Sequence, residues 1–500
     1  MDIEDICSKF IKKIKKDDLI LVAFVFIFGI LNYFFLITNN VLSGDGLFNG
    51  PIFFSGNWEF DLGRPLLIVL DKLRFGIVNP PIIMFFALLY ISISILIIKR
   101  TFKIKKLFPM ILISLSMILF PVYSEISTCI YCFDYYMLSM LLSVLAVYFI
   151  DKRKYIISII LVTISLFIYQ AFVSITIVGV MILFIIDVLN NKSDLKKLIF
   201  NMLTVFIGLI LYFVILKGLF LVFHRTFADY KGASSFGFVS LIKSLPISIL
   251  NCYKDFYQYF FTDMIIYNKH YFRNIINIIM FVLFFITFIK VLIKLDNKNK
   301  SFLLLSIILL PICVNVMDVI SGSNITAMTC VSYIFIYILM IIVIYNYLSI
   351  KTIKSIFYIL IVILSYTYLL SNNSTFMVRN EIHNNFYYKC NELLIKIKNT
   401  NGYNEDLPIM INDIFKYESD FLPKSNGFIA LQNETFENHV GLKGYSIFYK
   451  RYFGEDITMV DKDTYLNIIE TDEYKNMKIG DVEIINNVIV AKISDNVIYD

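Results

Sequence analysis

Residues 19–37 read LILVAFVFIFGILNYFFLI, and residues 43–65 read SGDGLFNGPIFFSGNWEFDLGRP. The first stretch carries no charged residue, and about 20 apolar residues suffice for a helix to cross the roughly 30 Å core of a bilayer. The second stretch contains the only tryptophan of the chain and four charged residues, namely Trp58, Asp45, Glu59, Asp61 and Arg64. This succession predicts a membrane span that is followed directly by a polar loop at the membrane surface.

The composition of the whole chain supports this interpretation. Of the 500 residues, 58% are hydrophobic and 17% are charged, and the mean hydropathy is +0.74. A soluble protein of this length carries more charge. We therefore predict a polytopic α-helical membrane protein with about 11 transmembrane helices. The predicted spans are 19–38, 81–98, 108–122, 135–150, 155–170, 171–189, 198–222, 275–293, 302–320, 326–347 and 354–371.

Lysine and arginine residues lie in every second loop between these spans. The clusters occupy residues 9–16, 99–106, 152–154, 192–197, 290–300 and 351–354. All of them fall on one side of the membrane if the N-terminal residues 1–18 are cytoplasmic. Loops 39–80 and 223–274 and the tail 372–500 are then extracytoplasmic. This topology accounts for the net charge of +6, so no nucleic-acid partner is predicted.

The tail differs in kind from the transmembrane domain, which we assign to residues 19–371. Its segments NEDLPIMINDIF, GFIALQ and VEIINNVIVAKISD mix apolar and polar residues, with turn signals at Asn401-Gly402 and Gly480-Asp481. This pattern predicts a small α/β domain over residues 372–500. Elsewhere, Cys129-x-x-Cys132 has no second cysteine pair that could complete a zinc site, so no metal site is predicted.

Asp45 is the candidate catalytic residue of the first outer loop. It lies between Gly44 and Gly46, which allow a tight turn and the close approach of another molecule. A carboxylate at the lipid boundary is partly desolvated, which raises its pKa and suits a general base. The alternative is that Asp45 only caps the following helix.

Four further residues of the outer loops are candidates for substrate binding near Asp45. Arg64, in the tripeptide GRP, can hold a phosphate with its fork of donors, or it can pair with Asp61 or with lipid headgroups. Glu59 and Asp61 can bind substrate or a metal, or they can simply solvate the loop. Glu125, or alternatively Asp134, can supply a second acid to the site, or these acids can simply solvate their loop.

Polar residues of the later outer loops complete the candidate set. Tyr169 and Gln170 contact either substrate or a neighbouring helix. Arg225 and Lys231 lie where the topology requires no basic residue, which favours phosphate binding. Asp318, with Asn315, is expected to bridge neighbouring helices.

The motifs GDG, NW and GRPLL between the first two spans resemble the first outer loop of the O-antigen glucosyltransferase II family, which consists of integral-membrane glycosyltransferases of the C-type superfamily. The stretch LFIYQAF at residues 166–172 is similar to a second recurrent segment of that family. The resemblance covers about residues 15–370, and the family fold it implies agrees with the predicted spans.

The resemblance implies a hexosyltransferase of the bacterial cytoplasmic (inner) membrane. Such enzymes take a sugar, here glucose, from a polyprenyl-phosphate donor in membrane lipid and pass it to a surface glycan, with inversion. The acid that activates the acceptor corresponds to Asp45. The family often has two adjacent acids at this place, whereas Gly46 follows here, so Glu59, Asp61 or Glu125 would supply the second. The phosphate leaving group is already an anion, so no cofactor is expected; a divalent metal is compatible but not required.

Three other functions are compatible with many spans and outer loops. A flippase or transporter of lipid-linked sugars would place charges at mid-membrane, where this sequence has few. A polysaccharide polymerase or ligase would depend on later arginines, such as Arg225 and Arg273. A scaffold subunit of a cell-envelope complex would use the tail as its binding module.

Overall fold

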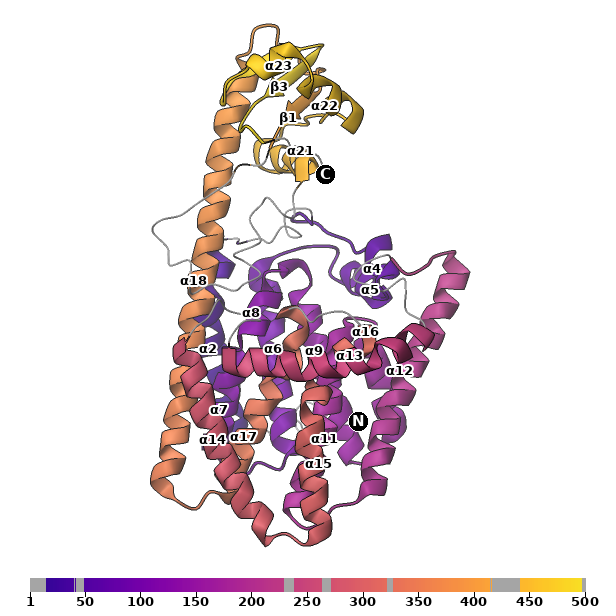
Figure 1. Ribbon diagram of the computed structural model, residues 1–500, viewed down its shortest axis with the longest axis vertical. Helices are drawn as coiled ribbons and strands as arrows, with labels where there is room; N and C mark the ends of the chain where they lie inside the picture. The colour runs from indigo at the N-terminus through magenta and orange to yellow at the C-terminus, as the bar shows by residue number, and fades with distance from the viewer. Residues whose placement is uncertain are drawn as a thin grey trace, which may run out of the picture.

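The computed structural model describes residues 15–39, 41, 49–228, 238–262, 271–321, 327–413, 415 and 441–496. It consists of a long helical bundle with a small domain beyond one end (Figure 1). The bundle helices are α2 (Lys16–Asn39), α6 (Pro80–Thr101), α7 (Leu107–Ile118), α8 (Pro121–Ser127), α9 (Phe133–Asp151), α10 (Tyr155–Leu166), α11 (Val173–Leu189), α12 (Leu195–Phe223), α14 (Tyr271–Lys294), α15 (Asn297–Val314), α17 (Ile334–Tyr347) and α18 (Lys351–Lys398).

Within these described residues, nine helices are long and apolar enough to cross a membrane. A tenth span results if α7 and α8, which meet at an angle of 42°, are counted as one. The prediction of 11 spans is therefore too high by this criterion. The shortfall lies at α10, which has only 12 residues and at 1.5 Å per residue covers about 18 Å, well short of a bilayer core.

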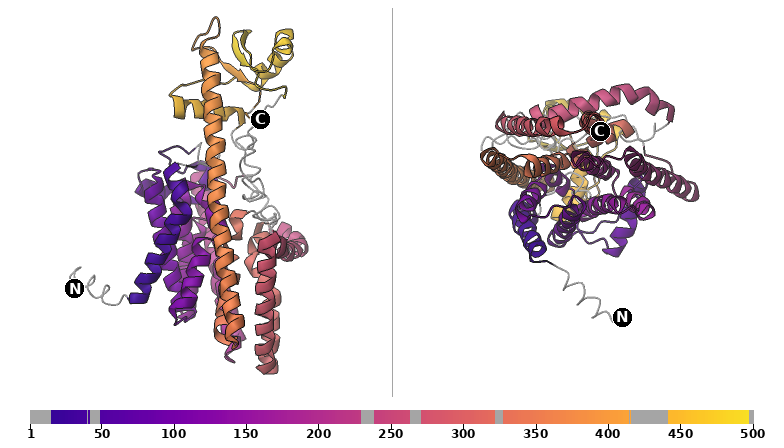
Figure 2. Two further views of the ribbon diagram at one scale, coloured as in Figure 1. Left: turned by 90° about the vertical axis from the view of Figure 1, so that its left-hand side faces the viewer. Right: turned by 90° about the horizontal axis from the view of Figure 1, so that it is seen from below.

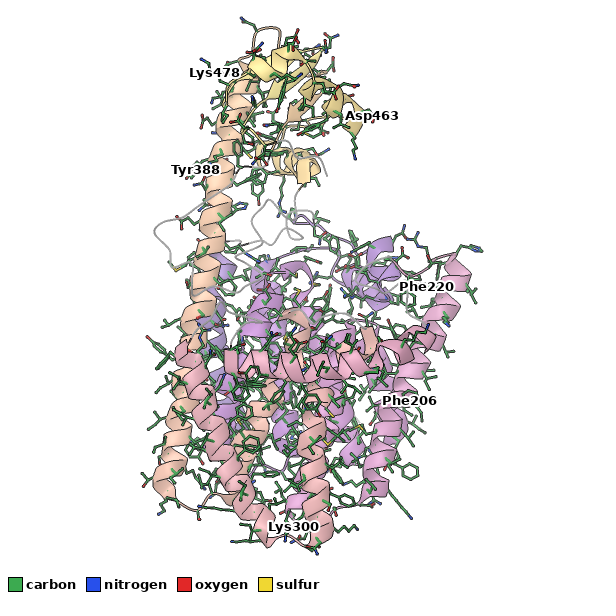
Figure 3. All side chains as sticks on the ribbon, viewed as in Figure 1. Phe206, Phe220, Lys300, Tyr388, Asp463 and Lys478 are labelled. Atoms are coloured by element: carbon green, nitrogen blue, oxygen red, sulfur yellow. The ribbon has the colours of Figure 1, made fainter. Side chains whose placement is uncertain are left out.

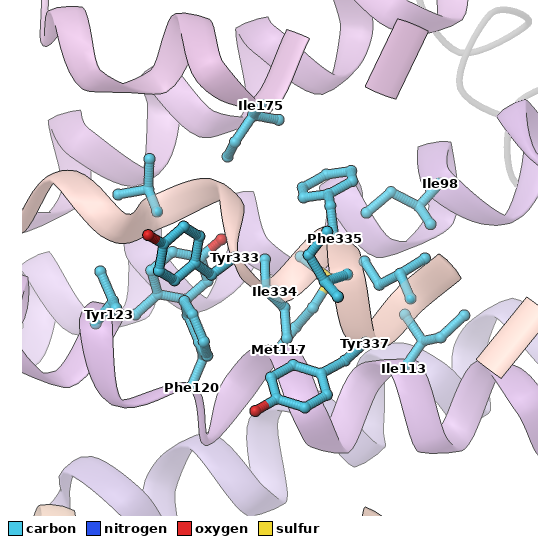
Figure 4. Close-up of a cluster of buried hydrophobic side chains, with 14 of the residues drawn as sticks. Ile98, Ile113, Met117, Phe120, Tyr123, Ile175, Tyr333, Ile334, Phe335 and Tyr337 are labelled. Atoms are coloured by element: carbon cyan, nitrogen blue, oxygen red, sulfur yellow. The ribbon is translucent and has the colours of Figure 1, made fainter. Parts of the chain in front are cut away.

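The centre of the bundle is formed by α17, in which every residue from Ile334 to Ile344 is buried. A helix that is apolar on all sides belongs inside a helical bundle rather than at its lipid surface. Figure 4 shows Tyr333, Phe335 and Tyr337 among the side chains of this core. In contrast, α12 lies at the edge of the bundle, and its Phe206 points outward with 57% of its surface exposed (Figure 3).

Side chains before several helices bind their first amide groups. Asn79 accepts a hydrogen bond from the amide of Ile82 ahead of α6, which begins at Pro80. Asp194 and Asp296 cap α12 and α15 in the same way. Such caps satisfy amides that have no partner within the helix, and each contributes on the order of 1 kcal/mol.

The loop between α2 and α6 contains two short helices, α4 (Asn57–Asp61) and α5 (Pro65–Leu73). Both lie at the end of the bundle that faces the small domain, which we call the loop end (Figure 1). At the same end, α13 (Phe238–Tyr257) runs across the bundle helices instead of along them, and the π-helical turn η4 (Gln258–Thr262) follows it. Three short 3-10 segments, η1 (Ile130–Cys132), η2 (Gln170–Phe172) and η5 (Ala327–Ser332), and the short helix α16 (Val316–Ser321) complete the set.

The last bundle helix, α18, continues for 48 residues and carries the small domain (Figure 2). The predicted domain boundary at residue 372 lies inside this helix. Beyond it, β1 (Ile409–Ile411), β2 (Val482–Ile485) and β3 (Val488–Ala491) form a sheet of order β1-β3-β2, in which β1 is parallel and β2 antiparallel to β3. The helices α21 (Gly441–Phe453), α22 (Lys462–Ile469) and α23 (Asp472–Asn476) accompany the sheet.

The small domain has a hydrophobic core of its own, to which Tyr445, Phe448 and Tyr465 contribute. Its β2–β3 hairpin turns at Asn486 and Asn487, both of which have positive φ angles, as a two-residue hairpin turn requires. The predicted strands in NEDLPIMINDIF and VEIINNVIVAKISD are found as β1, β2 and β3, whereas GFIALQ lies outside the described residues.

Candidate active site

Arg64 lies at the loop end as the residue immediately before α5. Its Nε donates to Oε1 of Gln170 at 3.2 Å, and its Nη1 donates to the hydroxyl of Tyr136 at 3.2 Å. Its guanidinium carbon lies 4.6 Å from the ring centroid of Tyr169, which is close enough for a cation–π contact. The arginine is thus held by α9 and by the junction of α10 and η2, and not by Asp61.

Gln170 joins this arginine to the backbone of the first loop. Its Nε2 donates to the carbonyl oxygens of Leu62, at 2.8 Å, and Gly63, at 3.2 Å, and lies 2.9 Å from the hydroxyl of Tyr212. The Tyr212 hydroxyl in turn donates to the carbonyl of Gly63 at 3.0 Å. Two carbonyls of the first loop are thus satisfied by side chains from η2 and α12.

The turn between α4 and α5 depends on Gly63, whose φ is +77°. A β-carbon at this position would clash with the Tyr212 hydroxyl and would lie 3.1 Å from Nε2 of Gln170. Glycine therefore provides both the left-handed backbone conformation and the close approach of the two side chains. We call Gly63, Arg64, Tyr136, Tyr169, Gln170 and Tyr212 the arginine cluster.

Asp61 and Arg225 form an ion pair beside the arginine cluster. Nε of Arg225 donates to Oδ1 of Asp61 at 2.8 Å, and Nη2 of Arg225 donates to Oδ2. The amide of Ala228 also donates to the carbonyl oxygen of Asp61 at 3.1 Å. This two-pronged pair connects the first loop to the segment that follows α12, so each of the two predicted substrate-binding residues is engaged with the other.

Glu59 acts within its own turn. Its Oε2 accepts a hydrogen bond of 2.8 Å from the amide of Gly56, the residue before α4. The neighbouring Trp58 leaves 53% of its surface exposed. Of the alternatives for Glu59, the structure shows a local capping contact.

Glu125 lies in α8 at the loop end and is almost completely buried. The layer around α8 is polar: Asn32 donates to the hydroxyl of the adjacent Ser124 at 3.1 Å, and Asn372 donates to Asn32 at 3.0 Å. The structure thus places Glu125 in the interior of the bundle. Asp45 and Lys231 lie outside the described residues, so their roles stay predictions.

A second charged cluster, which the sequence did not indicate, holds the far end of α5. Arg74 donates to Asp134 at 2.8 Å and to Asp71 at 3.2 Å, and it stacks on Tyr135 at 4.3 Å. Asp71 also accepts a hydrogen bond of 2.8 Å from the amide of Ser55. In the sequence, the three-residue spacing of Asp71 and Arg74 could have indicated an ion pair along one helix. No feature of the sequence indicated that Asp134 would be their partner.

The arginine cluster therefore gathers three predicted residues, Arg64, Tyr169 and Gln170, and adds Tyr136 and Tyr212. These two tyrosines lie inside predicted apolar spans, where the sequence gives no sign that they approach Arg64. No group of three or more His, Cys, Asp or Glu side chains suited to a metal ion occurs in the part of the chain that the structure describes. The arrangement can bind and orient an anion by charge-assisted hydrogen bonds.

The fold and this site define a polytopic membrane protein with a positively charged group held at one end of its bundle. Residues 34–344, more than half of the chain, match the family model described as Glucosyl transferase GtrII. The chain belongs to this family and is a glycosyltransferase of the kind that acts in O-antigen modification. Searches of curated proteins and of solved structures found no match.

Proposed function

We propose that this protein transfers glucose from a polyprenyl-phosphate donor to a cell-surface polysaccharide or a lipid-linked glycan. The main support for this proposal is the fixed orientation of Arg64, whose guanidinium contacts Gln170, Tyr136 and the ring of Tyr169. An arginine that is already oriented loses little side-chain entropy when it binds a phosphate, and its planar fork matches the phosphate oxygens.

Arg64 retains donor capacity in this arrangement. Its Nε and Nη1 donate to Gln170 and Tyr136, whereas Nη2 makes no hydrogen bond to a described residue. A guanidinium group has five N–H donors, so it can keep both contacts and still donate to a phosphate. Positive charge beside the glycosidic oxygen stabilises the polyprenyl phosphate as it leaves.

The proposed location is the outer face of the bacterial cytoplasmic membrane. Lys300 lies at the end of the bundle opposite the small domain (Figure 3). Because basic loops stay in the cytoplasm, this end is assigned to the cytoplasm, and the loop end with the small domain is assigned to the outside. A donor with a lipid tail would then reach Arg64 from the outer leaflet.

The proposed chemistry is a single displacement at the anomeric carbon. The acceptor hydroxyl attacks this carbon and loses its proton to the carboxylate of Asp45, the bond to the phosphate oxygen breaks, and polyprenyl phosphate leaves with both bonding electrons. Attack from the side opposite the phosphate inverts the anomeric configuration. Asp45 takes the proton as a general base, while Arg64 holds the leaving group.

The test uses membranes that contain the full-length protein, radiolabelled polyprenyl-phosphate glucose and an acceptor glycan. Transfer to the glycan is expected for the wild type and is expected to collapse in Asp45→Asn and in Arg64→Ala at equal expression. The variant Lys462→Ala, in the small domain, serves as a control that should keep its activity. Full transfer by Asp45→Asn would remove Asp45 from the chemistry, and movement of labelled donor across the bilayer without transfer would favour a flippase.

A further inference from the structure

Helix α13 has an unusual distribution of side chains. Its buried stripe consists of Ser248, Cys252 and Asp255, spaced four and three residues apart, so that they share one face. Its exposed face includes Ile247 and Leu250, which leave 62% and 67% of their surfaces uncovered. A helix packed on a soluble core shows the reverse pattern. The apolar exposed face suits lipid, and the polar buried face must therefore find polar partners in the bundle.

Those partners lie where α15 ends and α16 begins. Nδ2 of Asn315 donates to the carbonyl of Cys252 at 2.7 Å, while its Oδ1 accepts a hydrogen bond of 2.5 Å from Tyr333. The thiol of Cys252 lies 3.4 Å from the carbonyl oxygen of Asn315. Asn315 thus bridges helices as expected, and it fixes the register in which α13 meets α16.

This register brings Asp255 of α13 against Asp318 of α16. Both residues are buried, with 8% and 1% of their surfaces exposed. Oδ2 of Asp255 and both carboxyl oxygens of Asp318 have no hydrogen-bond partner among the described residues, and the two carboxyl groups lie close enough to interact with each other. Two buried carboxyl groups that interact directly cannot both be charged without a large cost, whereas one proton between them turns repulsion into a hydrogen bond.

The pair has little other charge around it. The described titratable and charged groups that interact with it are Lys254 and Cys252 from α13, and Cys330 and Tyr333 from the η5 region. Lys254 acts on Asp255 alone. Burial, followed by the charge of Asp255, raises the pKa of Asp318 to about 8, and burial also raises the pKa of Asp255.

We propose that Asp255 and Asp318 share one proton and form a pH-sensitive latch that docks α13 onto the loop end of the bundle. The latch is independent of the proposed transfer reaction. Once α13 separates from α16, each carboxyl group regains a pKa near the ordinary 3.8 and releases the shared proton. Docking is therefore strongest near pH 4 and weakens as the pH rises to about 8, above which it changes no further.

Hydrogen exchange of the full-length protein in a bilayer, at about pH 5.5, 7 and 8.5, tests the latch. The protection factor, which removes the intrinsic pH dependence of exchange, is compared between the amides of residues 247–257 and those of α6. We expect protection of α13 to fall about tenfold or more across this range while that of α6 holds. In Asp318→Asn, whose amide can donate to Asp255 at any pH, the fall should disappear.

Matched variants complete the test. Asp255→Asn should behave like Asp318→Asn, so either variant suffices if the other fails to fold, as judged by the protection of α6. Asp456→Asn removes an exposed carboxylate of the small domain and should keep the pH dependence of the wild type. A wild type with constant protection of α13, or a fall that persists in both variants of the pair, would overturn the proposal.

Discussion

The side-chain amide of Gln170 donates a hydrogen bond of 2.8 Å to the carbonyl oxygen of Leu62. The same side chain accepts a hydrogen bond from Arg64. One residue at the start of η2 thus fixes both the backbone of the first loop and the charged group that the loop carries. The sequence left substrate contact and contact with a neighbouring helix open for Gln170, and these hydrogen bonds lead us to expect a positioning residue that acts through Arg64.

Replacing Gln170 by Leu should lower transfer and destabilise the loop. The carbonyl oxygen of Leu62 and one guanidinium N–H of Arg64 would lose their partner, while the carbonyl of Gly63 would keep only Tyr212, and each unsatisfied buried group costs about 1–3 kcal/mol. We expect the rate of sugar transfer from the polyprenyl-phosphate donor to fall at least about tenfold at unchanged expression. Gln170→Glu keeps an oxygen that can accept from Arg64 but loses the N–H that donates to Leu62. This variant should therefore bind the polyprenyl-phosphate sugar better than Gln170→Leu does. Equal activity of Gln170→Leu and the wild type would contradict the positioning role.

Arg64→Lys should separate charge from geometry at the proposed phosphate site. Lysine keeps the positive charge but cannot contact Gln170, Tyr136 and a phosphate at once, because it lacks the planar fork. We expect a KM for the donor raised by about tenfold, on the basis of 1–2 kcal/mol of lost charge-assisted hydrogen bonding. Arg64→Ala should raise the KM for the donor more than Arg64→Lys does. Steady-state kinetics over a range of donor concentrations distinguish these results from a uniform loss of folded protein.

The ion pair between Asp61 and Arg225 is open to a charge-swap test. Asp61→Arg and Arg225→Asp should each reduce transfer, by about twofold to fivefold, because the pair is partly exposed to solvent. The double variant restores opposite charges and should recover part of this loss. Such recovery would assign both residues to a link between the two loops. If Arg225→Asp abolished transfer and the double variant recovered nothing, direct contact of Arg225 with substrate would be the better explanation.

Gly63→Ala should destabilise the first loop more than an ordinary glycine replacement. The backbone φ of +77° is unfavourable for alanine by roughly 1–2 kcal/mol, and the added methyl group would also clash with the Tyr212 hydroxyl. A lower thermal unfolding midpoint and slower transfer are expected. Combining Gly63→Ala with Tyr212→Phe removes the clash but not the backbone strain, so recovery should be partial. Gly218→Ala, where a β-carbon meets no atom within 4 Å, is the matched control.

Much of the architecture was accessible from the sequence because lipid imposes a simple rule. A span must be apolar for its whole length, and each predicted span overlaps a helix of the structure. The number of spans was less accessible, because α10 and the bent pair of α7 and α8 are apolar enough but too short or too bent to pass as single spans. Apolar composition does not show where a helix ends inside protein.

The candidate site was accessible only in part. The tripeptide at Arg64 suggested an anion clamp, and the polar pair at Tyr169 and Gln170 stood out between two apolar runs. That these segments meet could not be predicted, since Gln170 and Leu62 lie 108 residues apart. The partnership of Asp61 and Arg225 spans 164 residues. Such contacts arise from the packing of helices, for which a single sequence carries no direct signal.

The length of α18 has a mechanical consequence. Its 48 residues correspond to about 72 Å, of which a bilayer core takes about 30 Å. Because Phe386, Cys390 and Ile397 of α18 belong to the core of the small domain, the free part of this helix between the hydrocarbon and that domain is a stiff, uninterrupted rod of roughly 20 Å. A flexible tether would let such a domain collapse onto the membrane or sweep a wide volume. The rod instead keeps the small domain at a fixed height above the membrane surface at which the arginine cluster lies.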